Sequence, residues 1–314
     1  MKHVFIINPA AGKGKAESLI RPKIEDAVKG RKIEYEIIVT ESSDDAKRIC
    51  KSFAQSGEHI RLYVCGGDGT ICDVVNAIYG HDNVEFAVIP LGSGNDFVRF
   101  FGTKEQFGDI NAQIDGTAIK IDAIRYNDIV AINQCSMGFD AEVCIKQSYF
   151  KKMPIFTGES AYMAALVYCL GSKRSSHLKI TIDDRDVYDG EFIFAYCGNG
   201  RFYGGGFQPG PYALPDDGYL DFSLIKAMKL PKFLSKIGEY KKGKHYSWPE
   251  TTYVRGKKMV VRADKESAVN IDGECLTDIE STFEIIEKAF NFVIPTTSSY
   301  IEDRKSGKIN NKIG

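Results

Sequence analysis

The sequence predicts an α/β domain followed by a β-rich domain, and three observations lead to this fold class. In the first third of the chain, apolar strand-like runs alternate four times with segments of helical periodicity, which is typical of a doubly wound parallel sheet. From Thr117 onwards short β-rich runs dominate, which predicts an antiparallel, β-sandwich-like arrangement. The length of 314 residues is also roughly twice what a single core comfortably supports. We therefore expect an α/β domain over 1–118, a β-rich domain over 119–294 and a polar C-terminal segment over 295–314, which either packs back on the first domain or is loose.

The elements of the first domain follow from apolar periodicity and turn residues. Residues 4–8 form an apolar run that ends in Asn-Pro, as a buried strand entering a turn does. Apolar residues recur at helical spacing over 16–29, and Gly30 suits the end of that helix. The same patterns predict strands over 33–39, 60–65 and 86–90, and helices over 44–53 and 70–79.

The second domain is predicted from shorter runs. The alternation at 260–263 (Val-Val-Arg-Ala) fits a half-buried antiparallel strand. Two helical stretches, 160–171 and 230–241, interrupt the strands. The expected strands cover 119–124, 129–134, 178–182, 192–196, 220–225, 253–262, 269–271 and 283–286. We expect the active site to lie in a cleft between the two domains.

Composition excludes several classes of protein. Apolar residues make up 43% of the chain and charged residues 26%, which excludes a disordered or low-complexity chain. The 41 basic and 42 acidic residues nearly balance, whereas a dedicated nucleic-acid binder usually carries a basic surplus. The chain contains no apolar stretch of 18 residues, and its eight cysteines show no C-x-x-C spacing. These features predict a reduced, cytoplasmic protein whose membrane contact is peripheral, at the inner face, and which binds no nucleic acid.

The sharpest local motif is Gly66-Gly67-Asp68-Gly69-Thr70, which follows a predicted strand and precedes a predicted helix. Glycines let the main chain approach a phosphate closely, and the N–H groups at a helix start favour an anion. A carboxylate in such a loop would repel a bare phosphate, so its presence indicates a divalent cation between the two. The alternative is a tight turn in which Asp68 merely caps the helix.

Two further loops are predicted at the same edge of the sheet, where open α/β sheets bind their ligands. They are Asn8-Pro9-Ala10-Ala11-Gly12-Lys13 and Gly92-Ser93-Gly94-Asn95-Asp96. The three loops together predict one composite nucleotide site. Lys13 could neutralise phosphate charge there, or it could be an ordinary solvated lysine. The spacing fits neither a P-loop nor a dinucleotide fingerprint.

As a set, these residues resemble the diacylglycerol kinase catalytic-domain family, specifically its bacterial lipid kinases. The family pattern is N-P-x-S-G, then G-G-D-G-T, then G-T-x-N-D followed by an aromatic residue and a nearby Arg. The resemblance continues at Asp122, at the Asn133–Glu142 stretch, at the Leu214–Asp221 loop and at Asn270-Ile271-Asp272-Gly273-Glu274. It covers most of residues 4–290.

The resemblance implies an ATP- and Mg²⁺-dependent kinase that phosphorylates a lipid hydroxyl, with diacylglycerol as the leading acceptor. Asp68, Asp96 and Asp122 would organise catalytic Mg²⁺, Lys13 would neutralise phosphate charge, and Glu274 would be the general base. A structural Mg²⁺ site would use the Asp217 carboxylate and the carbonyls of Leu214 and Tyr219. The residues implied to hold ATP are Asn8, Pro9, Ala10, Ala11, Gly12, Thr40, Gly66, Gly67, Asp68, Gly69, Thr70, Ile71, Cys72 and Ser93.

Two of these residues also have purely structural interpretations, and two positions depart from the family pattern. Without the resemblance, Glu274 is a turn glutamate after Asp-Gly, and Asp217 belongs to a Pro-Asp-Asp-Gly turn. Ala11 stands where the family has Ser, which removes one hydrogen bond worth about 0.5–1.5 kcal/mol, whereas Ser93 in place of Thr keeps its hydroxyl.

Several other readings stay open at this stage. The acceptor could be a sphingoid base, a ceramide-like lipid or a polyprenol, and a non-catalytic nucleotide sensor of the same fold is a further reading. The basic stretch 226–245 either docks on a membrane or is a solvated helix face. The sequence also leaves open whether the protein forms a homodimer.

Overall fold

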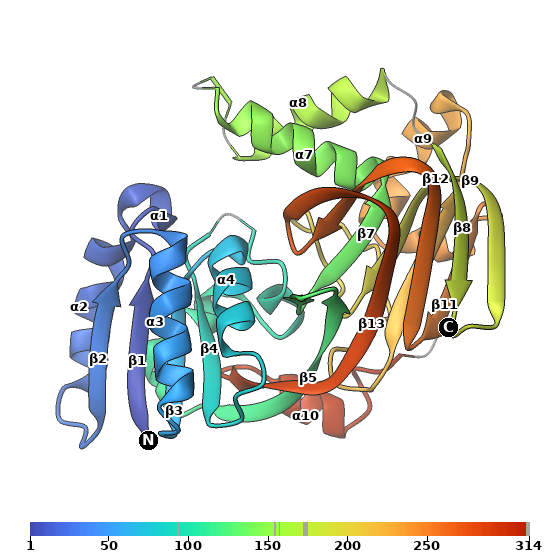
Figure 1. Ribbon diagram of the computed structural model, residues 1–314. Helices are drawn as coiled ribbons and strands as arrows, with labels where there is room; N and C mark the ends of the chain where they lie inside the picture. The colour runs from blue at the N-terminus through green and yellow to red at the C-terminus, as the bar shows by residue number, and fades with distance from the viewer. Residues whose placement is uncertain (93, 154, 157, 172–174, 312–314) are drawn as a thin grey trace. The chain divides into compact units, whose positions relative to one another are not determined.

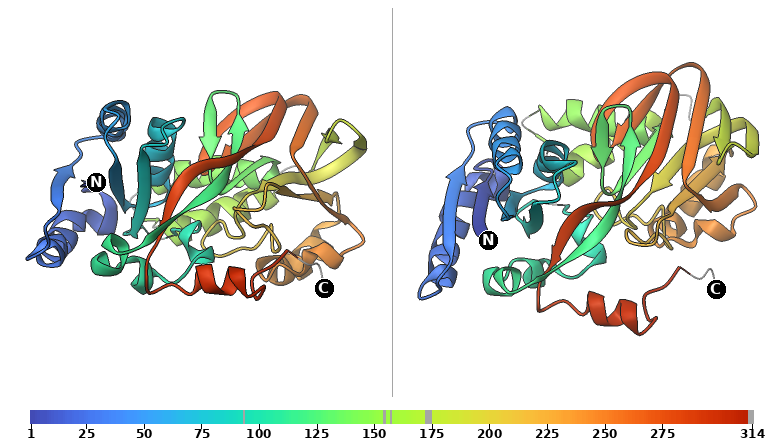
Figure 2. Two further views of the ribbon diagram at one scale, coloured as in Figure 1. Left: turned by 90° about the horizontal axis from the view of Figure 1, so that it is seen from below. Right: turned by 60° about the horizontal axis from the view of Figure 1, so that its bottom comes forward.

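The computed structural model describes residues 1–92, 94–153, 155–156, 158–171 and 175–311. The chain forms two compact units. Unit 1 contains Met1–Ala123 together with the described residues from Glu287 onwards, and unit 2 contains Ile124–Ile286. The predicted limits at 118 and 294 lie a few residues from these divisions, because the long strands β5 (Thr117–Tyr126) and β13 (Glu274–Ile294) each pass through both units and pair with each other (Figure 2).

Unit 1 is built on a parallel sheet with the strand order β2-β1-β3-β4 (Figure 1). Its strands are β1 (Lys2–Ile7), β2 (Glu34–Val39), β3 (Ile60–Gly66) and β4 (Val84–Pro90). The end of β13 adds a parallel neighbour to β4 through Asn291 and Phe292. The central strands are buried on both faces, which is why their sequences are continuous apolar runs rather than alternating ones.

Helices cover both faces of this sheet. Alternate strand residues such as Phe5, Tyr63 and Ala87 pack against α2 (Ala16–Val28) and α6 (Ile110–Ile114). On the other face α4 (Asp68–Ile78) packs on β3, and α3 (Ser43–Gln55) packs on α4 (Figure 1). The shorter helices are α1 (Ala11–Gly14), η1 (Val98–Phe100), α5 (Lys104–Phe107) and α10 (Tyr300–Lys305).

The C-terminal segment packs on unit 1. The hydroxyl of Ser298 donates a hydrogen bond to the carbonyl of Phe101 (2.6 Å), and the Gln106 side chain donates to the carbonyl of Thr297 (2.6 Å). The ring of Tyr300 meets the ring of Phe101 edge-on at 4.7 Å between centroids. These contacts fix α10 beside η1 and α5.

Unit 2 contains a sheet of antiparallel pairs. The long strands β9 (Asp186–Gly198) and β12 (Lys258–Ile271) both pair with β7 (Gln134–Gly138) near one end and with β8 (Ser176–Ile182) near the other. The strand β10 (Leu220–Lys226) joins β9 to β11 (Thr251–Gly256), and β13 pairs with β12. The short strand β6 (Ile129–Ala131) pairs with β5. The predicted single strands over 129–134 and 253–262 are each divided in two.

Successive side chains of β9 point to opposite faces of the sheet, and each face belongs to a different hydrophobic core. Ala195 and Cys197 face a core made of strand residues, whereas Phe194 and Tyr196 face a second core beneath the helices. These helices are α7 (Phe139–Lys151), α8 (Gly158–Leu170) and α9 (Leu230–Lys241), with the short η2 (Lys244–Ser247) after them. The helix α7 was not predicted, because Asp140 and Glu142 interrupt the apolar spacing that marks a helix. Within the described parts of the chain, no helix is long and apolar enough to cross a membrane.

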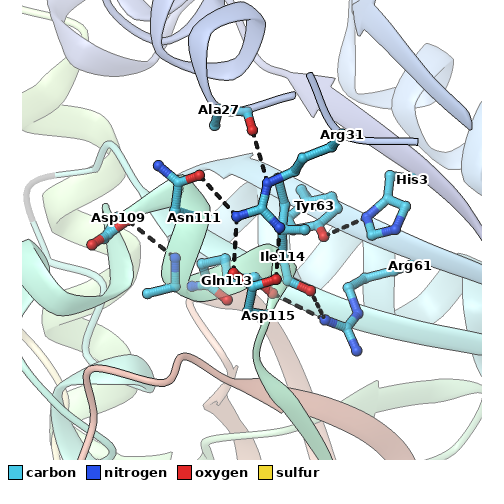
Figure 3. Close-up of polar contacts among 11 residues, drawn as sticks. His3, Ala27, Arg31, Arg61, Tyr63, Asp109, Asn111, Gln113, Ile114 and Asp115 are labelled. Atoms are coloured by element: carbon cyan, nitrogen blue, oxygen red, sulfur yellow. Dashed lines mark hydrogen bonds and ion pairs between the residues drawn. The ribbon is translucent and has the colours of Figure 1, made fainter. Parts of the chain in front are cut away.

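A polar network at the amino-terminal ends of the unit 1 strands joins α6 to the sheet (Figure 3). The buried Arg61 guanidinium donates to the carbonyls of Gln113 (3.0 Å) and Ile114 (2.8 Å) and pairs with Glu85 (2.7 Å). At the same edge, Arg31 binds both carboxylate oxygens of Asp115 in a more exposed position. The network lies at the edge opposite the three predicted loops, so we assign it to stability.

Replacing Arg61 by Met should lower the free energy of unfolding by about 3 kcal/mol, because Glu85 and two helix-end carbonyls lose their partner in a buried place. Replacing Arg31 by Met should cost less than about 1 kcal/mol, since its ion pair is partly exposed. Denaturant unfolding of both variants measures this difference. Equal losses would contradict the structural role given to Arg61.

Candidate functional site

The turn between β3 and α4 holds the candidate site together. Gly67 is the N-cap residue of the helix, and Asp68 lies in the first helical turn. Asp68 is therefore not the helix cap, which was the alternative interpretation of this motif. The Asp68 carboxylate instead accepts hydrogen bonds from the backbone N–H groups of Asn95 (2.8 Å) and Asp96 (3.0 Å). One carboxylate therefore connects the glycine-rich turn to the loop that follows β4.

The close approach of these two loops requires glycine at specific positions. A side chain at Gly92 would begin 2.6 Å from the Cα atom of Gly67. A side chain at Gly94 would begin 2.7 Å from a carboxylate oxygen of Asp68. Real Cβ atoms do not approach other atoms so closely, so any larger residue would push the loops apart.

The first loop joins the same cluster. The side-chain amide of Asn8 donates to the Thr70 hydroxyl (2.9 Å), and its oxygen accepts from the N–H of Ala10 (3.0 Å). The N–H of Gly12 donates to the carbonyl of Leu91 (3.1 Å). All three predicted loops thus meet at the carboxyl edge of the sheet, where ligands of parallel α/β sheets bind.

The backbone after Asn8 is unusual. Gly12, Lys13 and Gly14 have φ angles of 59°, 60° and 77°, so three successive residues are left-handed. Such a run needs glycine at most positions, and Lys13 is the exception. The side chain of Lys13 is exposed.

Two basic residues also contact the loop that follows β4, Arg99 from the motif and Lys104 beyond it. The Lys104 ammonium donates to the carbonyl of Gly92 (2.9 Å), and Arg99 lies 3.4 Å from a carboxylate oxygen of Asp96. Both line an open groove of about 1060 Å³, which also contacts Asn95 and Tyr300. Sequence reasoning did not single out Lys104, because it follows the motif by several residues and belongs to no recognisable spacing.

The remaining residues predicted to hold ATP differ in their positions. Thr40 is buried, and its hydroxyl lies 3.4 Å from the carbonyl of Ile7. Ile71 and Cys72 are buried in the core of unit 1 within α4. Pro9, Ala10 and Ala11 belong to the first loop. Ser93 lies outside the described residues.

Asp122 is buried on β5 and is held by β13. Its carboxylate accepts a hydrogen bond from the backbone N–H of Lys288 (2.8 Å), where β13 is left-handed at Lys288 (φ 54°). Asp68 and Asp96 are therefore brought together directly, whereas Asp122 is fixed by a different pair of strands.

In unit 2, Glu274 lies at a rigid hairpin between β12 and β13. Asp272 and Gly273 form the two-residue turn with φ angles of 48° and 96°, the conformation that Asp-Gly sequences favour. The Asp272 carboxylate accepts hydrogen bonds from the N–H groups of Ile132 (2.7 Å), Asn133 (3.2 Å) and Gln134 (2.7 Å). Glu274 is exposed beside this anchored turn.

In the loop predicted to hold a structural metal ion, the Asp217 carboxylate pairs with the guanidinium of Arg255. Asp217 accepts a hydrogen bond from the N–H of Tyr219 (3.1 Å) on one oxygen, and Arg255 pairs with the other (2.5 Å). Arg255 also reaches the buried Asp221, 3.4 Å away. The Asp217 carboxylate thus already has a guanidinium and a backbone N–H as partners, and a metal ion held by Asp217 and the carbonyls of Leu214 and Tyr219 stays a prediction. Among the residues described, no cluster of three or more His, Cys, Asp or Glu side chains is arranged to hold one.

Unit 2 also contains a narrow apolar pocket beneath its helices, about 500 Å³ when the open space at its mouth is included. Its lining comes from α7, α8, α9 and the sheet, and includes Phe139, Leu166, Phe194, Phe233 and Trp248. Sequence reasoning did not find it, because apolar residues that line a pocket look like core residues.

Polar groups interrupt this apolar wall, and three of them are buried together with it. The hydroxyls of Tyr203 and Tyr240 lie 3.2 Å apart, and the third group is the buried carboxyl of Asp140. Neither oxygen of Asp140 makes a hydrogen bond of standard geometry to a described residue. Burial raises the pKa of Asp140 to about 6, although the Ser136 hydroxyl and backbone N–H groups at the start of α7 favour the charged form.

Comparison with known proteins gives this arrangement a family. Residues 2–126 match the diacylglycerol kinase catalytic domain, and residues 133–294 match the YegS C-terminal NAD kinase beta sandwich-like domain. The chain belongs to the diacylglycerol kinase-like lipid kinases. The resemblance drawn from the motifs is thereby confirmed, and so is the class of activity, a lipid kinase.

Individual relatives agree with this assignment. A protein of Pseudomonas aeruginosa named "Probable lipid kinase YegS-like" is 29% identical over 86% of this chain and 88% of its own length. A protein of Staphylococcus carnosus named "Diacylglycerol kinase" is 27% identical over 86% of this chain and 87% of its own. The crystal structure of a diacylglycerol kinase from Bacillus anthracis superposes with a TM-score of 0.68 and 22% identity, covering 93% of this chain and 96% of the other, and shows a shared fold.

The buried carboxyl of Asp140 gives this lipid kinase a pH-dependent stability. The folded-state pKa of about 6 lies above the value near 3.9 of an unfolded aspartate, so the folded state binds the proton more tightly. As pH rises from about 4 to about 6, the wild-type protein should lose up to about 3 kcal/mol of stability relative to an Asp140→Asn variant, which stays neutral. Denaturant unfolding at several pH values measures this, and a difference that does not vary with pH would contradict it.

Proposed function

We propose that this lipid kinase transfers the γ-phosphoryl group of ATP to the hydroxyl of a membrane lipid, with diacylglycerol as acceptor and phosphatidic acid as product. The observation that supports it most directly is the bond between the Asp68 carboxylate and the two N–H groups of the loop after β4. These bonds hold the turn after β3 against the loop after β4, and Asn8 adds the first loop through Thr70, so three loops meet at one sheet edge as in a phosphate site.

Phosphoryl transfer needs positioning and charge neutralisation more than covalent chemistry. In the proposed complex the loops at 8–13, 66–70 and 92–96 surround the triphosphate, and the N–H groups at the start of α4 contact its oxygens. Lys13 supplies positive charge from the left-handed turn of the first loop. Ala11 offers no hydroxyl to the phosphate groups.

The oxygen-rich surroundings of Asp96 suit a magnesium ion. Asp68 and Asp96 bring carboxylate oxygens to the same loop pair, and the side-chain oxygen of Asn95 is buried and accepts no hydrogen bond from a described residue. Carboxylate and amide oxygens are the ligands that Mg²⁺ prefers. We propose that Asp68, Asp96 and Asp122 hold this ion, partly through water. When bound, it would neutralise charge on the phosphate oxygens.

Glu274 is the proposed general base. As the lipid oxygen forms its bond to the γ-phosphorus and the bond from that phosphorus to the departing ADP oxygen breaks, the hydroxyl proton passes to the Glu274 carboxylate. Asp272 is a positioning residue, because its three N–H contacts fix the turn that carries Glu274. The placement of this base and the ATP loops in one interdomain cleft stays a prediction.

The apolar pocket of unit 2 suits the hydrocarbon part of the acceptor. An alkyl chain buried there would leave water at a gain of about 0.8 kcal/mol per methylene group. The ester groups of diacylglycerol only accept hydrogen bonds. They would therefore bind Asp140 best when its carboxyl group is protonated and can donate one.

Asp140 also favours a second candidate acceptor. A buried carboxylate without a hydrogen-bond partner of standard geometry suits a ligand that donates a hydrogen bond. A lipid alcohol with an amino group or an additional hydroxyl, such as a sphingoid base, has such a donor. Product analysis separates the two acceptors.

Incubation with γ-labelled ATP, Mg²⁺ and a mixed lipid extract, followed by chromatography of the labelled lipids, tests the function. Label in phosphatidic acid would establish diacylglycerol as the acceptor. Label in another lipid would show that the acceptor is a different lipid, while the proposed reaction would stand. Absence of labelled lipid, with ATP binding intact, would overturn the proposal and favour a nucleotide sensor.

Replacing Glu274 by Gln should lower kcat at least about 100-fold, because general bases typically contribute that much or more. ATP affinity should stay within about twofold, since the residue acts on the acceptor. Glu284→Gln, an exposed glutamate on the same strand, is the matched control and should leave kcat unchanged. Equal kcat for wild type and the Glu274 variant would remove Glu274 from the mechanism.

A further inference from the structure

The outer face of the α7–α8 hairpin exposes an unusual amount of apolar surface. Five large apolar or tyrosine side chains are exposed there, from 55% for Met163 to 79% for Ile155, with Tyr149, Val167 and Tyr168 between them. Among the described residues, twelve large hydrophobic side chains are exposed, and these five fall within 20 consecutive positions. Exposed clusters of this kind mark binding surfaces rather than ordinary solvated faces.

Ring contacts connect part of this exposed set. The ring of Phe150 lies 6.2 Å from that of Tyr168, 5.9 Å from that of Tyr149 and 5.2 Å from that of Phe156, the neighbour of Ile155. Met163 and Val167 lie one turn apart on α8, and Val167 adjoins Tyr168. We call this set, Tyr149, Ile155, Met163, Val167 and Tyr168, the apolar patch. Figure 1 shows α7 and α8 lying against each other.

The sequence of α8 is apolar on both sides. Ala161, Ala165 and Cys169 recur at helical spacing and are buried, while Met163 and Val167 lie between them and are exposed. Residues 160–170 contain no charged side chain. A helix on the surface of a water-soluble protein normally has a charged outer face, so this composition indicates an apolar environment for the outer face as well.

The inner faces of the same two helices line the apolar pocket. Phe139, Asp140 and Val143 of α7 and Tyr162 and Leu166 of α8 contact it. One hairpin therefore has the pocket on its inside and the apolar patch on its outside. A lipid that enters the pocket from a bilayer would pass beside a structural element with an apolar surface. This hairpin has apolar side chains on both of its faces.

Basic groups border the apolar patch. The Lys146 ammonium lies 5.3 Å from the centre of the Tyr168 ring, and Lys152 is exposed directly after α7. Tyrosine and lysine at the rim of an apolar surface are typical of contact with the headgroup region of an anionic bilayer.

The basic helix α9, the other candidate for membrane contact, uses several of its lysines within unit 2. Lys232 pairs with Glu250, Lys236 lies 4.3 Å from the centre of the Trp248 ring, and Lys241 lies 5.5 Å from that of Phe207. These contacts favour the interpretation of α9 as an ordinary surface helix.

We propose that the apolar patch on α7–α8 is a membrane-docking surface that inserts into one leaflet of an anionic bilayer. The choice of a bilayer as occupant rests on the proposed function, because a kinase of a membrane lipid must reach its acceptor there. The hairpin lies in the interface plane, with its apolar patch among the acyl chains and Lys146 and Lys152 at the headgroups.

The test replaces the exposed aliphatic residues by serine in one variant, Ile155→Ser, Met163→Ser and Val167→Ser. The matched control replaces three aliphatic residues of similar exposure elsewhere, Leu19→Ser, Val187→Ser and Ile279→Ser. Co-sedimentation with vesicles of phosphatidylcholine and phosphatidylglycerol measures binding without any need for activity. The patch variant should bind at least about tenfold more weakly, and the control should bind like wild type. A Val167→Trp variant should bind more tightly, since tryptophan favours the bilayer interface.

Kinase assays separate this inference from the proposed function. The patch variant should phosphorylate a water-soluble short-chain diacylglycerol at the wild-type rate and lose activity only on vesicles. If no lipid is phosphorylated but the patch variant loses vesicle binding, the docking surface stands and the proposed function fails. Unchanged vesicle binding by the patch variant would overturn the docking surface. Conversion of a wild-type dimer to a monomer, measured by light scattering, with unchanged vesicle binding would show a subunit interface instead.

Discussion

The candidate site depends on one carboxylate that receives two backbone N–H groups. Asp68 begins α4, yet its side chain reaches across to Asn95 and Asp96 and thereby fixes the loop after β4 against the turn after β3. Gly67, Gly92 and Gly94 let the two backbones approach closely enough for these bonds. Asn8 then joins the first loop to the same turn through Thr70. Hydrogen bonds to a charged acceptor are stronger than neutral ones, so this single side chain can order two otherwise independent loops, to which the first loop is then attached.

Unit 2 contains a similar aspartate with backbone N–H donors, here in an antiparallel sheet. The Asp272 carboxylate receives the N–H groups of residues 132–134 and so anchors the hairpin that carries Glu274. In both units the proposed site residues lie next to an aspartate whose oxygens accept hydrogen bonds from backbone N–H groups. Preorganised geometry of this kind reduces the reorganisation that phosphoryl transfer would otherwise require. Asp217 accepts one backbone N–H, from Tyr219, and its other oxygen pairs with Arg255.

Sequence patterns predicted the strands and helices of unit 1 well, because buried parallel strands and amphipathic helices leave strong periodic signals. The three loops and their meeting place followed from the glycine motifs and from the rule that parallel strands end at one edge. The helix α7 was missed because Asp140 and Glu142 occupy positions where an apolar residue would mark a helix. The apolar pocket, the contact of Lys104 with Gly92 and the pairing of Asp217 with Arg255 join segments distant in sequence, so no local pattern could reveal them. The motif could assign Asp68 to the site, but its bonds to Asn95 and Asp96 required the structure.

Backbone hydrogen exchange at Asn95 and Asp96 tests the central role of Asp68 most directly. In the wild-type protein both amides should be protected, because each donates to the Asp68 carboxylate. An Asp68→Ala variant should exchange these two amides roughly 10 to 100 times faster, the range expected for loss of a hydrogen bond to a charged group. The strand amides of β3 should stay protected, and Asp73→Ala, a change on the same helix, should leave the loop unaffected. Equal protection of Asn95 and Asp96 with and without the Asp68 carboxylate would contradict the account, since the loop would then be ordered by other contacts.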